Sequence, residues 1–469
     1  MIPMSTVAAS TAPDSRPPRA GRAAQARLAV DRLRTAAVDA VAVGWVDNAG
    51  LARVKAVPVS GLEHAAAWGI GAAPCFDTFL VDDSVTASRR AGGPVGDLRL
   101  QPDLDRLVPL AAQPGWAWAP ADRYTQDGSP HPGCQRLFAR RMERAARDRG
   151  LTLLAGIETE WVAALAGPPD EEPRYPTHGP AYGLQRLTDL SDYLRDVLRA
   201  LEQQGLTVLQ IHPEYAPGQF EVSVAAEGPV AAADTAVLVR HTVRAVSARH
   251  GLRASFAPAV EPGGGVGNGA HLHLSLWRGG RNLGHGGPGP HGLTEEAEAF
   301  LAGVLAALPE LLVLGTPSPA GYLRLAPSRW AGAYQCWGLE NREAALRLVT
   351  GSDGEQATAA NAEIKCFDAT ANPYLMIGSV IAAGLAGIDR GLRLPPETTV
   401  DPAALAPETV RRLPTDLMEA VAAYEKSVVL REALGEELYE AVLAVRRAEH
   451  ELFAGRGDEE IIAATRWRY

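Results

Sequence analysis

The chain has 469 residues, of which 46% are hydrophobic and 21% charged, and its formal net charge is −10. This composition is typical of a soluble globular protein, and the length suits two domains or one large domain with an appendage. No stretch approaches the 18 uninterrupted apolar residues of a membrane span. The negative charge without a Lys/Arg run argues against nucleic-acid binding, and four cysteines without Cys-X-X-Cys spacing indicate reduced, buried thiols in a cytoplasmic protein.

The N-terminal quarter of the chain divides into a tail and a small domain. Residues 1–25 are rich in Pro, Ser, Ala and Arg without the apolar core of a signal peptide, so we predict a disordered tail. Residues 41–59, VAVGWVDNAGLARVKAVPV, predict a β-hairpin, because two β-rich runs flank an Asp-Asn-Ala-Gly turn. The sequence stays β-rich to about residue 120. We therefore expect an N-terminal domain at residues 26–122 and a catalytic domain at residues 123–469.

Helices and strands alternate through the rest of the chain. Helices are predicted at residues 133–150, 190–205 and 233–251, and a buried apolar helix at residues 376–388, with more helices to the end. Strands are predicted at residues 151–165, 268–277, 344–349 and 362–368, and a turn that leads into a strand at residues 214–224. This order indicates an α+β or α/β domain with helices on a mainly antiparallel sheet.

Residues 324–338, RLAPSRWAGAYQCWG, are predicted to form a loop. Pro327, Gly332 and Gly338 oppose a helix there. The stretch nevertheless carries Trp330 and Trp337, two large side chains. We expect Trp337 to lie in the core.

Glutamates recur on the predicted strands. Glu158 and Glu160 share one face of the strand at residues 151–165, because alternate residues of a strand point the same way. Glu214 precedes a Pro-Gly turn, and Glu221 follows it in an otherwise apolar strand. One such pair alone is best explained as a solvated strand face.

Histidines occur in a similar pattern. His271, His273 and Ser275 share one face of the strand at residues 268–277, and Glu363 and Lys365 share one face of the strand at residues 362–368. If these faces line one cavity, their negative charge requires divalent cations. Carboxylate-rich sites suit Mg²⁺ or Mn²⁺, and an imidazole among the ligands indicates that the site also accepts Mn²⁺. Two such ions are suited to phosphoryl transfer from ATP.

Two further features fit phosphate chemistry. Arg342 and Arg347 offer guanidinium groups that match phosphate oxygens, although surface ion pairs with Glu340 or Glu343 explain them as well. The glycine-rich segment at residues 261–271 lacks the ending of a Walker loop and is a weak signal for phosphate binding.

Taken together, these motifs resemble the glutamine synthetase family. GIETEW, EYAPGQFEVSV, GNGAHLHLSL, ENREAALRL and FDATANPYL occur in the family's order, and GLARVKAVP with GDLRLQPD is similar to its N-terminal β-grasp domain. The resemblance covers about residues 35–469. It implies an α+β fold in which a small β-grasp domain precedes a large catalytic domain with a curved antiparallel sheet. It also implies a homododecamer of two stacked hexameric rings, with each site completed by the neighbour's N-terminal domain.

The resemblance also implies a reaction. ATP phosphorylates the γ-carboxylate of glutamate, and an amine then attacks the acyl phosphate to form a γ-glutamyl amide. The first metal would be held by Glu160, Glu214 and Glu221, and the second by Glu158, His271 and Glu363. Substrate binding would involve Arg324, Gly267, Gly269 and Lys365, nucleotide binding would involve His273, Ser275 and Arg347, and Arg342 and Arg347 would surround the transferred phosphoryl group.

The acceptor position departs from that of ammonia-using members. They carry a glutamate in the loop after the substrate arginine, and Trp330 stands at the aligned position here. An indole cannot act as a base, but it can offer a flat wall or a cation–π face to an organic amine. Trp330 therefore favours an organic amine over ammonia. The alternative is that Trp330 only packs the loop.

Other departures leave parts of the site open. Lys365 stands where an arginine is usual, and Asn361 where a basic residue is usual, which puts the identity of the acid substrate in question. Asp77, Asp82 and Asp83 are alternative counterparts of the family's ammonium-binding aspartate, and Asp77 is our choice for a catalytic role. The competing hypotheses are an ammonia-using glutamine synthetase and a non-catalytic relative, the latter opposed by the six intact metal-ligand positions.

Overall fold

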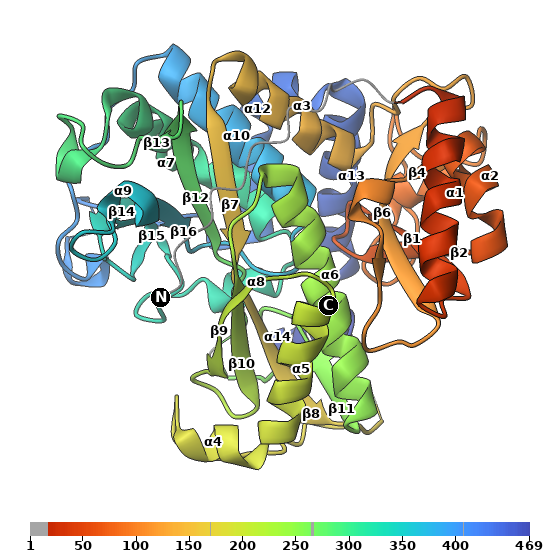
Figure 1. Ribbon diagram of the computed structural model, residues 1–469. Helices are drawn as coiled ribbons and strands as arrows, with labels where there is room; N and C mark the ends of the chain where they lie inside the picture. The colour runs from red at the N-terminus through yellow and green to blue at the C-terminus, as the bar shows by residue number, and fades with distance from the viewer. Residues whose placement is uncertain (1–16, 169, 264–266, 407) are drawn as a thin grey trace.

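The computed structural model describes residues 17–168, 170–263, 267–406 and 408–469 (Figure 1). The first residues of the predicted tail lie outside these ranges. The prediction was wrong for residues 19–25, because helix α1 spans Arg19–Thr35. Its buried face, Ala26, Ala29, Val30 and Leu33, packs into the core of the N-terminal domain.

The N-terminal domain is built on a mixed sheet, drawn in red and orange at one side of Figure 1. Its strand order is β2-β1-β6-β4-β3, with β5 also paired to β6. The elements are β1 Ala40–Val46, β2 Ala52–Pro58, α2 Leu62–Trp68, β3 Ile70–Ala72, β4 Leu98–Pro102, β5 Val108–Pro109 and β6 Trp116–Tyr124. The predicted hairpin is confirmed, because β1 and β2 pair antiparallel and Val46 faces Ala52 across the turn.

The catalytic domain contains two further sheets. One has the order β11-β8-β10-β9 and comprises β8 Thr159–Leu165, β9 Val208–Pro213, β10 Gln219–Val224 and β11 Leu252–Ser255. The other has the order β13-β12-β16-β15-β14, with β7 also paired to β12. Its strands are β7 Thr152–Ile157, β12 Leu272–Arg278, β13 Arg281–Asn282, β14 Tyr334–Leu339, β15 Ala344–Val349 and β16 Asn361–Ile364. The pairings are antiparallel except that β14 runs parallel to β15.

Two sequence expectations need correction here. The single strand predicted at residues 151–165 is two strands in different sheets, and the chain passes from one sheet to the other at Glu158. The predicted loop at residues 324–338 ends early, because β14 begins at Tyr334 and includes Trp337. Trp337 is buried, as expected. The alternation of apolar residues in Tyr334–Leu339 is too short for a strand to be distinguished from a loop by sequence alone.

Long helices cover these sheets and form the core between them. They are α3 Gln135–Asp148, α5 Ser191–Gln203, α6 Pro229–Arg249, α7 Glu295–Gly315 and α10 Pro373–Asp389, with α11 Leu417–Tyr424, α12 Val428–Leu434, α13 Glu436–Leu452 and α14 Asp458–Thr465 near the C-terminus. Short helices are α4 Leu184–Asp189, α8 Gly321–Arg324 and α9 Gln356–Ala359. By length and composition α7 could cross a membrane, but 89% of its most apolar window is buried in the protein, as in a core helix. The four cysteines are free thiols, three buried and Cys75 half-buried.

Helix α10 shows how local sequence sets an element that supports the site. Asn372 caps it by accepting hydrogen bonds from the N–H groups of Tyr374 and Leu375, and Pro373 occupies the first turn, where no N–H donor is needed. Asn372 also donates to the carbonyl groups of Val46 and Asp47. One residue therefore starts a core helix and links the catalytic domain to the N-terminal hairpin.

Asp368, in the segment that joins β16 to α10, carries a prediction about stability. Its Oδ1 accepts hydrogen bonds from Thr370, while Oδ2 is buried without a partner among the described residues. Burial raises the pKa of Asp368 to about 6. The folded state therefore keeps a proton that the unfolded chain releases near pH 4, so the contribution of Asp368 to stability is highest below pH 4 and declines as the pH rises to about 6.

We expect Asp368→Asn to remove this decline, which amounts to at most about 3 kcal/mol. The measurement is the urea midpoint of unfolding between pH 4 and pH 7, with the exposed Asp353→Asn as the matched control. The same pH slope in Asp368→Asn and in the wild type would contradict the assignment.

Candidate active site

Strand register brings the first group of site residues into a row. In the sheet that contains β8, β9 and β10, Glu221 on the middle strand pairs directly with His212 on β9 and with Glu160 on β8. Directly paired residues of neighbouring antiparallel strands lie on the same face within about 5.5 Å. The row therefore places two carboxylates and an imidazole side by side.

The second sheet produces a similar row. Glu363 on β16 pairs with His273 on β12 and with Arg347 on β15. Glu158 follows the end of β7 and donates its backbone N–H to the carbonyl of His271, which immediately precedes β12. The two rows thus belong to different sheets, and Glu158 lies where the chain crosses between them.

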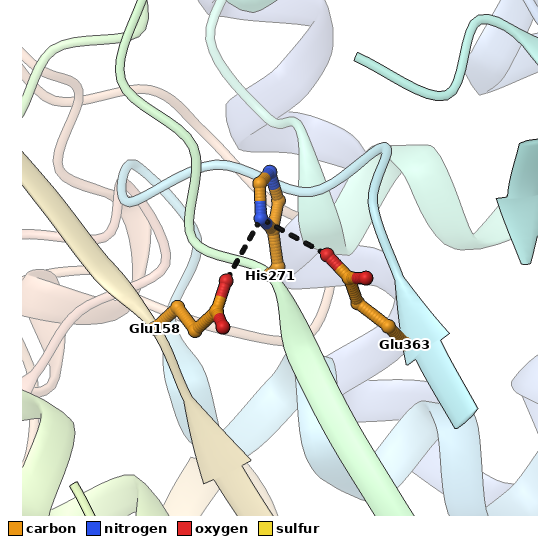
Figure 2. Close-up of side chains that lie close together, drawn as sticks. All are labelled: Glu158, His271 and Glu363. Carbon is orange, nitrogen blue, oxygen red and sulfur yellow. Dashed lines mark hydrogen bonds and ion pairs between the residues drawn. The ribbon is translucent and has the colours of Figure 1, made fainter. Parts of the chain in front are cut away.

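Glu158, His271 and Glu363 converge on one point (Figure 2). The Nδ1 atom of His271 lies 3.2 Å from Glu158 Oε2 and 3.2 Å from Glu363 Oε1, and the three side chains come from different segments. One ligand atom from each lies within 4.8 Å of the others. Although burial opposes ionisation, the His271 hydrogen bond and Lys365 hold the pKa of Glu363 well below its usual range. The cluster is the predicted second metal set, and its geometry suits one divalent cation.

Positive groups surround Glu363. Lys365 Nζ lies 3.0 Å from its Oε1 and Arg347 Nη1 lies 2.9 Å from its Oε2. Arg324 donates to His271 Nε2 at 3.0 Å and is almost fully buried. Three cations thus lie within hydrogen-bonding distance of this cluster, where they can also bind the anionic groups of a substrate.

The second group that could hold a metal consists of His212, Glu214 and Glu221. His212 lies 3.4 Å from Glu214 through Nδ1 and 3.4 Å from Glu221 through Nε2. Burial and the nearby Glu160 raise the pKa of Glu214 to about 7, and the hydrogen bond to Glu221 raises that of His212 to about 9. Crowded carboxylates with raised pKa values are the electrostatic setting that a divalent cation relieves.

His212 was missed in the sequence, and it joins Glu214 and Glu221 in this group, while Glu160 stays a predicted ligand of the same metal. Both oxygens of Glu160 have other neighbours: Oε2 accepts hydrogen bonds from Gln219 and from the backbone of Gly269, both at 2.9 Å, and Oε1 lies 3.8 Å from His271. The sequence held one signal for His212, its position two residues before Glu214, which puts both on one strand face.

These residues line a cavity of about 950 Å³. Its lining includes twelve of the predicted site residues: Glu158, Glu160, Glu214, Glu221, Gly267, His271, Arg324, Trp330, Arg342, Arg347, Glu363 and Lys365. It also includes residues that the sequence did not indicate, among them Gln210, His212, Tyr182 and Tyr215. The volume is within the range of cavities that hold small-molecule substrates and cofactors.

Gly267 and Gly269 allow the backbone to approach closely. A Cβ atom at Gly269 would lie 2.5 Å from His271 Nε2 and 2.7 Å from Arg324 Nη2, and one at Gly267 would lie 1.6 Å from the carbonyl oxygen of Pro258. No side chain fits at either position without moving these groups. The glycines therefore permit the packing of Arg324 and His271 at the base of the cavity.

Trp330 lies on a segment that we call the rim loop, residues 325–333 between α8 and β14. Half of the Trp330 side chain is exposed, and its ring meets that of Tyr215 edge to face at a centroid distance of 6.1 Å. Tyr215 follows Glu214, whose Oε2 accepts a hydrogen bond from Tyr182 at 2.8 Å. Aromatic side chains thus form one wall of the cavity, beside the group that contains His212.

Four predicted site residues do not line the cavity: Gly269, His273, Ser275 and Asp77. The Nε2 atom of His273 lies 3.1 Å from Glu158 Oε1. The hydroxyl of Ser275 accepts a hydrogen bond from Trp277. Asp77 is buried, and its two oxygens contact Arg123 at 2.5 Å and His131 at 2.8 Å. Asp77 thus makes a buried ion pair in its own chain, and its catalytic role stays a prediction, because the resemblance has the neighbour's N-terminal domain complete each site.

Comparisons with known proteins match this chain to glutamine synthetases. The family model described as "Glutamine synthetase, catalytic domain" matches residues 132–462, and "Glutamine synthetase N-terminal domain" matches residues 24–131. "Gamma-glutamylpolyamine synthetase GlnA3" of Streptomyces coelicolor is 55% identical over 96% of this chain and 98% of its own. "Glutamine synthetase" of Thermotoga maritima is 32% identical over 73% of this chain and 79% of its own.

Solved structures agree as well. "Crystal structure of novel glutamine synthase homolog" superposes with a TM-score of 0.82 at 35% identity, covering 92% of this chain and 99% of that one. "GmaS/ADP complex-Conformation 1" superposes with a TM-score of 0.79 at 26% identity, covering 91% and 96%.

Proposed function

The chain belongs to the glutamine synthetase family and is an ATP-dependent ligase that joins glutamate to an amine as a γ-glutamyl amide, and we propose that its acceptor is a polyamine. The observation that carries the proposal is the aromatic wall of Trp330 and Tyr215 beside the buried carboxylates. A protonated amine is attracted to both an aromatic face and a carboxylate, and a methylene chain packs against an indole. The name of the 55% identical Streptomyces relative points the same way.

We propose that the two carboxylate–histidine groups hold Mg²⁺ or Mn²⁺, since members of this family use divalent metals. One ion would be held by Glu158, His271 and Glu363. The other would be held by Glu160, Glu214 and Glu221, with His212 beside Glu214 and Glu221. These ions supply Lewis-acid neutralisation of phosphate charge when they are bound.

The protein's own cations complete the phosphoryl-transfer site. Arg347 is held against Glu363 by an ion pair of 2.9 Å, and both Arg347 and Arg342 line the cavity. Both can neutralise charge on the phosphoryl group during transfer. Arg324 and Lys365 are the cations available to the carboxylate of glutamate. The assignment of His273 and Ser275 to the nucleotide stays a prediction.

The reaction also requires a base that deprotonates the attacking amine. An alkylamine is protonated at neutral pH and must lose a proton before it attacks the acyl phosphate. The cavity wall beside Trp330 carries Glu214 with its partner Tyr182, but Glu214 is one of the proposed metal ligands. In the proposed arrangement the wall holds the amine by its ring faces, and the proton passes to a base other than the metal ligands.

Phosphate release tests the proposed acceptor. We expect release from ATP, with Mg²⁺ and glutamate, to be fastest with putrescine, spermidine or spermine, and slower with monoamines and ammonium. The kcat/KM for each amine is the measurement, and mass spectrometry identifies the γ-glutamyl product. A higher kcat/KM for ammonium than for every organic amine would make this an ammonia-using glutamine synthetase and overturn the proposal.

We also propose a cytoplasmic homododecamer, in which the neighbour's N-terminal domain completes each site. Its support is the resemblance to the family and the match of both family domains. The mass of the purified protein in solution tests the assembly. A monomer that is fully active would contradict a site shared between subunits.

A further inference from the structure

Two of the residues at the centre of the rim loop have a backbone conformation that costs free energy. Ser328 and Trp330 have φ values of 55° and 53°, the left-handed region that residues with a Cβ atom seldom adopt. Such a conformation persists when neighbouring groups hold it in place. Those groups determine where the Trp330 ring lies.

Glu343 is placed to hold this conformation. Its Oε1 accepts a hydrogen bond from the backbone N–H of Trp330 at 2.7 Å, and the backbone N–H of Ser328 lies close enough to lower the pKa of the same carboxylate. A carboxylate bound to backbone N–H groups makes a strong, charge-assisted hydrogen bond. One side chain thus contacts both of the strained residues of the rim loop.

The backbone of Glu343 is held by hydrogen bonds, while its Oε2 is buried without a hydrogen-bond partner among the described residues. Its backbone N–H donates to Asn341 Oδ1 at 3.1 Å, and Asn341 Nδ2 donates to the carbonyl groups of Thr398 and Val400. Glu343 immediately precedes β15, the strand that carries Arg347. The rim loop is therefore anchored to the strand that carries a proposed phosphoryl-binding arginine.

Glu343 does not itself face the substrates. It is buried and is not among the residues that line the cavity, although its neighbour Arg342 and its partner Trp330 both are. Burial raises the pKa of Glu343, while the Trp330 N–H lowers it. A residue in this position can act on the acceptor amine only through the loop that it holds.

We propose that Glu343 is a positioning residue that holds the rim loop in its left-handed conformation and so sets the affinity for the acceptor amine. The inference rests on the proposed function in one respect, the contact between Trp330 and the acceptor. When Glu343 is lost, the rim loop relaxes, and the Trp330 ring leaves its position against Tyr215. Binding of ATP and glutamate does not depend on this contact.

Kinetics of four variants test the proposal. We expect Glu343→Ala to raise the KM for the preferred amine about tenfold, with the KM values for ATP and glutamate changed less than about twofold. Trp330→Ala should have a similar effect, and the double variant should be no worse than Trp330→Ala alone, because both changes act through one contact. Glu343→Gln keeps an oxygen that can accept from Trp330 and should retain most of the affinity.

A matched control removes a similar bond elsewhere. Glu397 accepts the backbone N–H of Leu339 at 2.8 Å on β14 and does not line the cavity, so Glu397→Ala should leave the KM for the amine unchanged. Limited trypsin digestion provides a second readout, since release of the rim loop should speed cleavage after Arg329 in Glu343→Ala but not in Glu397→Ala.

The outcomes separate the two proposals. An unchanged amine KM with unchanged cleavage in Glu343→Ala overturns the role of Glu343, as do additive effects of Glu343→Ala and Trp330→Ala. Faster cleavage in Glu343→Ala together with a Trp330→Ala enzyme of normal amine KM supports Glu343 as the anchor of the loop, but overturns the acceptor wall and with it the proposed polyamine site.

Discussion

Replacing Glu363 with glutamine is expected to lower kcat at least about a hundredfold. Glu363 is 1% exposed and contacts His271, Lys365 and Arg347 through its two oxygens. A neutral amide keeps the shape but removes the charge, so it binds a divalent cation poorly, leaves the buried Lys365 without its carboxylate partner and leaves Arg347 with Glu340 alone. No other described carboxylate contacts all three of these groups.

Metal titration separates the two causes of the lower kcat, which are weaker binding of the metal and the loss of the anion beside Lys365 and Arg347. We expect Glu363→Gln to require a much higher Mg²⁺ concentration for half-maximal phosphate release. The control is Glu340→Gln, because Glu340 also pairs with Arg347 but belongs to neither metal group. It should reduce activity far less and keep the wild-type metal dependence. Wild-type metal dependence in Glu363→Gln would remove Glu363 from the set of ligands.

Replacing Trp330 with glutamate is expected to shift the acceptor preference from organic amines toward ammonium. The change removes the ring that meets Tyr215 and the cation–π face, and it adds a carboxylate at the mouth of the cavity. A desolvated cation–π contact contributes about 2 kcal/mol, so kcat/KM for the preferred amine should fall about tenfold or more. A small cation such as ammonium needs no apolar wall and gains a base.

The measurement is the ratio of kcat/KM for the preferred organic amine to that for ammonium. Trp330→Phe keeps a ring and should keep most of the wild-type ratio. Trp330→Ala removes the ring without adding a base, so it should weaken the organic amine without improving ammonium. An unchanged ratio in Trp330→Glu would leave the indole as a packing residue only.

Much of the fold could be predicted from local sequence patterns. The hairpin at residues 41–59, the amphipathic helix at residues 190–205 and the apolar helix at residues 376–388 are all present. Their signals are the turn chemistry and the hydrophobic periodicity of the segments themselves. The errors occurred where such signals are short or absent, as at Tyr334–Leu339 and in the tail that contains the start of α1.

Part of the site could also be predicted from local sequence patterns. Ordered motifs identified Glu158, His271 and Glu363, which the structure brings within one cluster. The choice of Asp77 among the N-terminal aspartates stays a prediction. Asp77 sits opposite Arg123, 46 positions away in the chain, and a pairing at that distance has no local pattern.

What the sequence by itself determined is therefore the family, the α+β class and the chemical types of the site residues, because these depend on residue identity and local order. Tertiary structure alone decided which of them meet. Strand register placed His212 beside Glu221. The passage between sheets at Glu158 separated that residue from Glu160. The position of Glu343 directly before β15 placed its carboxylate against the backbone N–H of Trp330. The physical reason is that register and loop packing depend on the fit of segments distant in the chain, which no short stretch of residues specifies.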